Sequence, residues 1–319
     1  MITPDQPGSD SLQRFEWTPG GMTPDTDVPA FRLCRARGLP VPVLVATPHA
    51  GRAYSARIVE QMRDPSGSCL RLEDRLVDRL AQEIAQQTGA CLLLADTPRA
   101  VIDLNRAPDD VDWDMISDRP AHKPTATSAS KRSRSGLGLV PRRLSGMGEI
   151  WKARLPYREL EQRIETVHRP YHQALGLMLE SLRDRWGAAL LIDLHSMPPI
   201  KARFPDEPAP EFVIGDRFGA SCQASLTSAA SQFLAGNGRA CALNRPYAGG
   251  YVLDRHAQPA RGIHCLQLEV CRSTYLDVRL TEPSARLGSV ARLLAGLVRE
   301  LAAGVAALGG ERGLPLAAE

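Results

Sequence analysis

Two apolar runs, each followed closely by a histidine, constrain the fold and function of this chain more than any other feature. The first run, residues 42–46, precedes His49, and the second, residues 188–192, precedes Asp193 and His195. Both runs have the length of a strand that is buried on both faces. Because ligands bind at the carboxyl ends of such strands in open α/β sheets, we predict a metal or catalytic site built from distant parts of the chain.

Strand-like and helix-like patterns alternate along the chain, which is typical of an α/β fold. Short apolar runs predict strands at 41–47, 90–95, 100–104, 188–192, 212–215 and 263–270. Helical spacing of apolar residues predicts helices over 73–87, 158–185, 221–234 and 287–308. Pro170 could break the second of these helices. The expected architecture is a central, mostly parallel or mixed sheet that helices cover on both faces.

The chain divides into three predicted parts. Residues 1–38 are rich in Pro, Gly, Asp and Thr, show little periodicity and predict an irregular N-terminal arm. Residues 39–310 predict a single α/β hydrolase-type catalytic domain, and residues 311–319 a tail. Within the domain, residues 108–145 predict a long loop insertion. Its basic, Ser-rich part at 124–136 is typical of a solvated, mobile loop.

Composition excludes several classes of function. The net charge of +3 is too small to indicate nucleic-acid binding, and no aromatic residues are interleaved with the basic stretch at 131–134. No apolar run approaches the ~20 residues of a membrane span. The N-terminus has no secretory signal pattern, and the seven cysteines are an odd number without a CxxC pair. These features favour a cytoplasmic enzyme with reduced thiols.

The two histidines are the first candidates for chemistry. His49 follows a proline and precedes Gly51 by two residues, and a glycine there lets other backbone come close. Asp193 and His195 lie two apart on a predicted strand and share a face, so the carboxylate can orient the imidazole. The structural alternatives are a core histidine in the first case and a loop cap in the second.

A buried carboxylate and an arginine complete the candidates. Glu269 shares one face of a predicted strand with Gln267, and a carboxylate there is costly unless it is paired or used. It is a candidate general base for metal-activated water, with an ordinary ion pair as the alternative. Arg106 follows the predicted strand at 100–104 and can hold a carboxylate through two hydrogen bonds.

From about residue 40 to 305 the chain resembles the N-formylglutamate amidohydrolase family. The likeness rests on seven short motifs that keep the family's order and rough spacing. The motifs are PHAG (48–51), EDRLVDRL (73–80), RAVIDLNR (99–106), DLHSMP (193–198), GDR with SC (215–222), NRPYAGG (244–250) and GIHCLQLE with YLD (262–277).

The resemblance implies a three-layer α/β/α fold of the zinc-exopeptidase (phosphorylase/hydrolase-like) type, akin to carboxypeptidases and aspartoacylases. It also implies one zinc ion per chain, held by His49 and His195 and leaving a position open for water. Carboxypeptidase-like sites place a glutamate three residues after the first histidine, but that position is Arg52 here. The third ligand therefore has three candidates, of which the first is preferred: Asp74, Asp78 and Glu73. Two histidines and one carboxylate also suit other divalent metals.

The implied reaction is hydrolysis of an N-acyl, typically N-formyl, amide of a small acidic amino acid such as N-formyl-L-glutamate. Glu269 would take a proton from the metal-activated water, and Arg99 would stabilise the oxyanion. Asn105 and Arg106 would hold the substrate α-carboxylate and so orient the amide for attack. The resemblance adds three further substrate-binding candidates: Asn244, Tyr247 and His264.

Two other functions remain open at this stage. One is a carboxypeptidase-like peptidase that acts on a peptide or a cell-wall fragment, which needs an open groove rather than an enclosed Arg99 and Arg106. The other is a non-catalytic binding protein of the same fold. The combination of His49, His195 and Glu269 at strand ends speaks against it. The sequence leaves the oligomeric state open.

Overall fold

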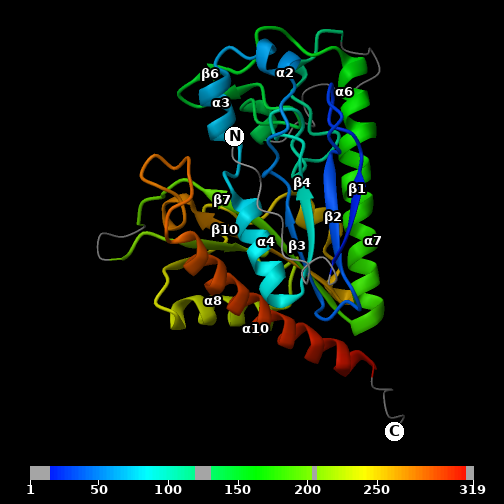
Figure 1. Cartoon of the computed structure of the whole chain (residues 1–319), viewed down its shortest axis with the longest axis vertical. Coiled ribbons are helices and arrows are strands. Elements are labelled where there is room, and N and C mark those ends of the chain that lie inside the picture. The colour runs from blue at the N-terminus through cyan, green and yellow to red at the C-terminus, as the bar shows by residue number, and fades with distance from the viewer. Residues whose placement is uncertain (1–14, 119–130, 203–206, 314–319) are drawn as a thin grey trace.

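A computed structural model describes residues 15–118, 131–202 and 207–313 of the chain. Most of the basic, Ser-rich stretch, residues 124–130, lies outside the described residues. The centre is an eight-stranded mixed sheet with the order β1-β2-β4-β3-β7-β10-β8-β9 (Figure 1). Its strands are β1 (Phe15–Gly20), β2 (Phe31–Ala36), β3 (Val43–Thr47), β4 (Cys91–Ala95), β7 (Ala189–Met197), β8 (Phe212–Gly215), β9 (Cys241–Leu243) and β10 (Ile263–Cys271).

Four parallel strands form the middle of this sheet and position the site. β3 pairs in parallel with β4 and with β7, and β7 pairs in parallel with β10. Every residue of these four strands is buried, as the continuous apolar runs predict. The register sets Glu269 opposite His195 and Asp193 opposite Ala46. The carboxyl ends of β3, β7 and β10 therefore meet at one edge of the sheet.

Helices cover both faces of the sheet, which confirms the predicted α/β/α layers. Alternate side chains of β3 point to opposite faces, so Leu44 joins one hydrophobic core and Val45 the other. The first core lies under α7 (Arg169–Trp186), and the second lies under α4 (Val77–Thr88), α8 (Ala224–Gly236) and α10 (Leu287–Gly313). Figure 1 shows α7 on one side of the sheet and α4 with α10 on the other. The shorter helices are α2 (Ala56–Gln61), α3 (Pro65–Leu72), α5 (Lys131–Arg134), α6 (Tyr157–Arg163) and α9 (Tyr251–His256).

The N-terminal region differs from the irregular arm predicted for residues 1–38. β1 and β2 pair with each other in antiparallel fashion, and β2 joins the sheet along β4. The sequence analysis did not predict these strands. β1 is an edge strand whose side chains are exposed or half-buried, so it lacks the apolar alternation that marks a strand.

Residues 100–104 differ in the opposite way. They are buried, as the apolar run suggests, but they form turns instead of the predicted strand. The backbone N–H of Asp103 donates to the carbonyl of Leu139 in the long insertion, at 2.7 Å, so this segment pairs with a loop. That insertion, residues 108–145, holds a 3-10 turn at Trp113–Met115 and a small hairpin strand, β5 (Arg143–Leu144), which pairs with β6 (Gly148–Glu149).

Pro170 does not break the long helix. α6 continues through a π-helical turn at Ile164–His168 directly into α7, with Pro170 in its first turn. The carbonyl of Thr166, four residues before the proline, instead accepts from the backbone N–H of Met22 at 3.0 Å, so the missing proline donor leaves it satisfied.

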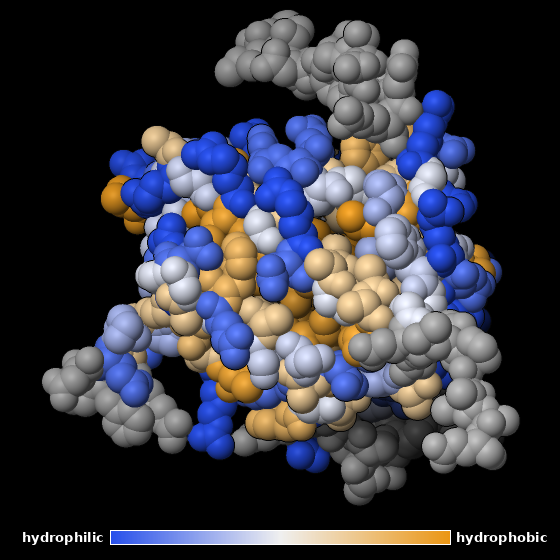
Figure 2. Space-filling model, turned by 90° about the horizontal axis from the view of Figure 1, so that it is seen from below, coloured by the Kyte–Doolittle hydropathy of each residue, from blue (hydrophilic) through white to orange (hydrophobic). Residues whose placement is uncertain are grey.

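The last helix, α10, contains a 24-residue span, Leu287–Gly310, that is long and apolar enough to cross a membrane by length and composition alone. Its buried side chains, including Leu294, Val298 and Leu301, belong to the second core, where the helix packs on α4 and α8. The face on which α8 and α10 lie has apolar side chains at its centre and hydrophilic ones around them (Figure 2). This packing is that of a helix covering a sheet.

Three buried histidines lie between the long helix and the site: His168, His172 and His256. Burial lowers the pKa of His168, and it lowers that of His172 well below the usual value. Burial and the positive charge of Arg255 lower the pKa of His256 to about 3. All three imidazoles are therefore neutral in the folded protein near neutral pH.

This cluster predicts a loss of stability in mild acid. Below the ordinary histidine pKa of ~6.5 the unfolded chain takes up protons that the folded protein does not, so the stabilising contribution is complete above that pH and disappears as the pH falls. For His256 alone, the free energy of unfolding should fall by up to about 1.4 kcal/mol per pH unit. Urea unfolding of the native protein and of His256→Phe at several pH values measures this. A slope that is the same in both proteins would contradict the prediction.

Candidate metal centre and active site

The loop after β3 delivers His49. The apolar strand ends at Thr47, and the chain turns at Pro48, so that His49 stands at the edge of the sheet with its side chain buried. A Cβ atom at Gly51 would overlap the carbonyl oxygen of Thr97, so only glycine lets the two segments lie this close. The close approach fixes the path of the histidine loop.

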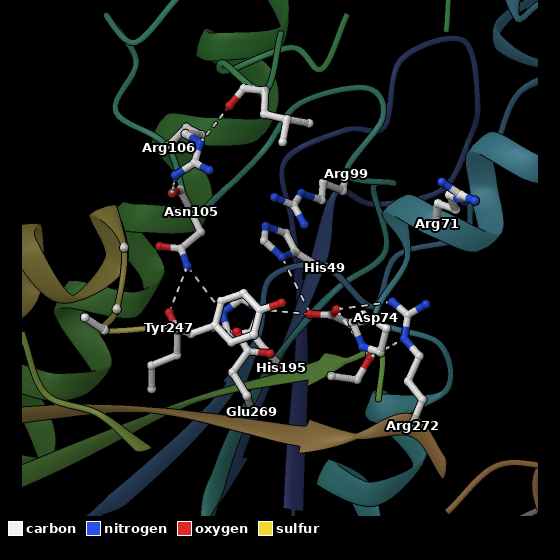
Figure 3. A pocket seen from close by; sticks show the side chains of 17 residues that line it. His49, Arg71, Asp74, Arg99, Asn105, Arg106, His195, Tyr247, Glu269 and Arg272 are labelled. Carbon is white, nitrogen blue, oxygen red and sulfur yellow. Dashed lines mark hydrogen bonds and ion pairs between the residues drawn. The ribbon is translucent and has the colours of Figure 1, made fainter. Parts of the chain in front are cut away.

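Asp74 and His195 arrive from two other parts of the chain. His195 lies near the end of β7, and Asp74 lies in the turn between α3 and α4. The backbone N–H of Asp74 donates to the carbonyl of His49 at 2.9 Å, which joins the two loops directly. His195 Nδ1 lies 2.8 Å and His49 Nδ1 3.6 Å from Asp74 Oδ2. The ligand atoms of these three buried residues all lie within 4.8 Å of one another and could hold a metal ion (Figure 3).

A buried carboxylate binds the far nitrogen of each imidazole. His49 Nε2 lies 2.7 Å from Asp103 Oδ1, and His195 Nε2 lies 2.9 Å from Asp193 Oδ2. With the Nε2–H groups donating to these carboxylates, both Nδ1 atoms present a lone pair toward Asp74. This arrangement fixes the tautomer and the direction of a metal-binding imidazole.

The electrostatics of the site favour a cation. Burial alone would raise the pKa of Asp74, but hydrogen bonds with His195 and His49 hold it well below the usual value. Burial alone would lower the pKa of His195, but the negative charges of Asp193 and Asp74 raise it well above the usual value. Asp193 Oδ1 is buried without a hydrogen-bond partner among the described residues. Positive charge is therefore stabilised here.

Glu269 and two arginines share the cavity with the histidines. The cavity has a volume of about 370 Å³, and Glu269, Arg99 and Arg106 line it. Burial, with the charges of Asp74 and Asp193 opposing that of His195, raises the pKa of Glu269 to about 7. Glu269 Oε1 accepts a hydrogen bond from Gln267 Nε2 at 2.9 Å. The sequence predicted this shared face of the strand.

The two arginines are held in different ways. Arg99 Nε donates to Asp103 Oδ2 at 2.9 Å, so the carboxylate that binds His49 also holds this guanidinium. Arg106 Nε donates to the carbonyl of Leu137 at 3.0 Å, and the residue is only 8% exposed. Both cations therefore face the cavity from fixed positions.

Asn105 and Tyr247 also line the cavity. The amide nitrogen of Asn105 lies 3.3 Å from Gln267 Oε1, and its amide oxygen accepts from the backbone N–H of Val252 at 2.9 Å. The same nitrogen lies 3.3 Å from His195 Nε2. Both ends of the Asn105 side chain therefore have protein partners. Tyr247 stands in front of the site in Figure 3.

Two predicted substrate-binding residues do not line the cavity. Asn244 Nδ2 donates to Asp216 Oδ1 at 2.7 Å and so braces the loop after β8. His264 lies near the start of β10, five residues before Glu269, which at ~3.3 Å per residue is about 16 Å from the site. Its Nδ1 accepts from the backbone N–H of Gln223. We correct both predictions, because the Asn244 side chain is turned toward Asp216 and His264 lies at the other end of β10 from the cavity.

The two rival carboxylates for the metal have partners elsewhere. Asp78 Oδ2 lies 2.8 Å from Arg52, the arginine that replaces the carboxypeptidase-like glutamate position. Glu73 Oε2 lies 3.2 Å from Arg75. Of the three candidates, Asp74 is the one that faces both histidines.

Sequence reasoning missed Arg272, which directly follows β10. Its guanidinium donates to Ser196 Oγ at 3.1 Å and to the carbonyls of Leu70 and Glu73. It also lies 3.8 Å from Asp74 Oδ1, so it holds the turn that presents this carboxylate. Arg272 follows a buried strand, as the two histidines do, and this position in the sequence could have indicated it as a site residue.

Comparisons with known proteins point to one family. A family model described as N-formylglutamate amidohydrolase matches residues 41–276. The N-formylglutamate deformylase of Pseudomonas putida is 32% identical over 275 residues, which cover 85% of this chain and 95% of that protein. The enzyme of the same name from Pseudomonas aeruginosa is 30% identical over 278 residues, with the same coverage.

Among solved structures, the N-formylglutamate amidohydrolase from Ralstonia eutropha JMP134 has a TM-score of 0.78 and 29% sequence identity, covering 89% of this chain and 99% of that one. A protein from Agrobacterium tumefaciens shares the fold, with a TM-score of 0.56 at 17% identity. Together with the cavity at the strand ends, these relatives define an enzyme that hydrolyses an amide C–N bond. The chain belongs to the N-formylglutamate amidohydrolase family.

The close approach at Gly51 gives a testable prediction. In Gly51→Ala the new methyl group meets the Thr97 carbonyl, so the His49 loop must shift, at a cost of roughly 1–3 kcal/mol in the free energy of unfolding. Urea unfolding and metal content measure the two effects. Gly236→Ala is the control, since a Cβ there meets open space. Native stability and native metal content in Gly51→Ala would contradict this account of the loop.

Proposed function

We propose that this enzyme removes the formyl group from N-formyl-L-glutamate in a zinc-dependent reaction, with Glu269 as general base. One observation carries the proposal. A buried group of two histidines and one carboxylate stands beside a carboxylate of raised pKa, in a cavity lined by arginines. The names of the curated relatives support the substrate.

The residues present fit a divalent metal. His49, Asp74 and His195 would hold it through two imidazole nitrogens and one carboxylate oxygen, a donor set typical of catalytic zinc with a position left open. Zinc would supply a Lewis acid that polarises the formyl oxygen and activates water. Asp193 Oδ1, which has no hydrogen-bond partner in the described part of the chain, and the two carboxylate–imidazole pairs supply the negative charge that such an ion needs.

Glu269 would handle the protons. Its pKa of about 7 suits a group that accepts a proton from attacking water and returns it to the leaving nitrogen near neutral pH. Gln267 donates to its Oε1, which fixes the rotamer and leaves the other oxygen for this transfer.

The arginines would bind and orient the substrate. Arg106 would hold the α-carboxylate, and Arg99 would stabilise the negative oxygen that develops on the formyl carbon. Arg106 is 8% exposed, so it is a largely buried part of the cavity wall. An enclosed arginine favours a small acidic substrate over the peptide that an open groove would take.

A direct experiment combines metal analysis with an assay of amine release. We expect about one zinc per chain, and chelator-sensitive release of amine from N-formyl-L-glutamate. The comparison substrates are N-formyl-aspartate, N-acetyl-glutamate and N-acetyl-aspartate. Turnover that resists the chelator would overturn the proposed zinc dependence. Preference for another substrate in this panel would overturn the assignment of N-formyl-L-glutamate.

Two variants separate metal binding from proton transfer. Glu269→Gln should keep its zinc and lose turnover by about 10²–10⁴-fold, because the amide cannot accept the proton. His195→Ala should lose zinc, because one of three ligands is gone. Metal content and kcat are measured on both proteins. Full activity in Glu269→Gln would exclude Glu269 as the general base.

The role of Arg106 is tested through KM. Arg106→Ala should raise KM for N-formyl-L-glutamate by roughly 10–100-fold with a much smaller change in kcat, since a charge-assisted pair to the ground-state carboxylate is lost. Arg292→Ala, an exposed change on α10, is the matched control. An unchanged KM would place the α-carboxylate elsewhere in the cavity.

A further inference from the structure

The three buried histidines of the long helix and α9 lie directly behind the cavity wall. His168 ends the π-helical turn, His172 follows one turn later in α7, and His256 ends α9. None of them lines the cavity or belongs to the metal-binding group. The mechanism above does not use them, although burying three imidazoles together has a cost unless each is hydrogen-bonded.

Two of these imidazoles hold the backbone that carries Asn105 and Arg106. His168 Nε2 lies 2.9 Å from the carbonyl oxygen of Arg106, and His172 Nε2 lies 3.0 Å from that of Leu104. A carbonyl oxygen only accepts, so both nitrogens must carry the proton. The histidines therefore bind the segment 104–106 from the side opposite the cavity.

The proton on His172 Nε2 determines the role of His256. With that proton in place, Nδ1 of His172 is an acceptor, and His256 Nε2, 3.0 Å away, donates to it. The two rings are nearly parallel, with an interplanar angle of 13° and centres 5.3 Å apart, as an edge-to-edge hydrogen bond requires. The chain of hydrogen bonds thus runs from α9 through α7 to the backbone at Leu104.

The start of α9 closes this chain into a ring. The backbone N–H of Val252 donates to Asn105 Oδ1, and the Tyr251 ring lies 5.1 Å from His172 and 5.7 Å from His168. The glycine before Tyr251 lines the cavity. Two walls of the cavity, residues 104–106 and the start of α9, are thereby joined through the same histidines.

His168 and His172 stand where the π-helical turn at Ile164–His168 passes into α7. Because they are four residues apart, they share one face of the helix and present their imidazoles to the same segment, with ring centres 4.4 Å apart. Single π turns inside α-helices are frequent at functional sites.

We propose that His168, His172 and His256 are positioning residues that hold Arg106 and Asn105 for binding of the substrate carboxylate. The inference rests on the proposed function, in which Arg106 binds that carboxylate. A phenylalanine at position 172 would fill nearly the same space, but it could neither donate to Leu104 nor accept from His256. If His172 only fills space, His172→Phe should have little effect on substrate binding. If His172 positions residues 104–106, the same change should weaken substrate binding.

Kinetics provide the first test. His172→Phe should raise KM for N-formyl-L-glutamate about 3–30-fold, with kcat changed less than KM and zinc content unchanged. In the Arg106→Ala background the same change should have no further effect on KM, because the guanidinium it positions is gone. Tyr171→Phe is the control, since this buried neighbouring hydroxyl has no hydrogen-bond partner among the described residues. An unchanged KM in His172→Phe, or an equal rise in KM with and without Arg106, would overturn the proposal.

Hydrogen exchange provides a second test that does not need turnover. The backbone amides of residues 104–106 should exchange at least about tenfold faster in His172→Phe than in the native protein, while those of α8 and the whole of Tyr171→Phe stay unchanged. Faster exchange spread evenly over the chain would show a purely structural role. Native exchange rates at residues 104–106 would overturn the proposal that the histidines hold this segment. If the native enzyme does not act on N-formyl-L-glutamate, the proposed function fails, but this measurement still decides whether the histidines hold the segment.

Discussion

The site depends on two hydrogen bonds between a buried carboxylate and an imidazole, Asp103 with His49 and Asp193 with His195. Each fixes which nitrogen of the ring is free, and both free nitrogens then face Asp74. The parallel register of β3, β7 and β10 brings the strand ends together, so that the two oriented imidazoles meet at Asp74. The sheet therefore sets where the two rings lie, and the two carboxylates set which nitrogen each ring presents.

The polar network extends outward from these two bonds, and some of its groups bind two partners. Asp103 binds His49 and Arg99, and Asn105 joins the surroundings of His195 to the start of α9. Such sharing is expected in a buried site, where an unpaired polar group is costly and each partner restricts the next. It explains how residues from three separate segments of the chain keep a fixed geometry.

The sequence predicted the layers, the parallel centre and the gathering of His49, His195 and Glu269, because buried strands leave long apolar runs and the polar residues after them stand out. It did not predict β1, whose side chains face solvent, or the turns at residues 100–104, whose apolar run is buried without being a strand. Asn244 and His264 were placed by resemblance alone, which carried no information about where the Asn244 side chain points or which end of β10 His264 occupies. Arg272 was missed although it follows a buried strand as the histidines do.

The long insertion at residues 108–145 meets the site through both backbone and side chain: the Leu137 carbonyl accepts from Arg106, the Leu139 carbonyl accepts from the N–H of Asp103, and the Asp110 carboxylate lies 4.0 Å from Arg106 Nε. A change in the path of the insertion would therefore move these two carbonyls, and with them Arg106 and the carboxylate that binds His49. The insertion is thus a support for one wall of the cavity, whereas His49, Asp74 and His195 all lie on other segments of the chain.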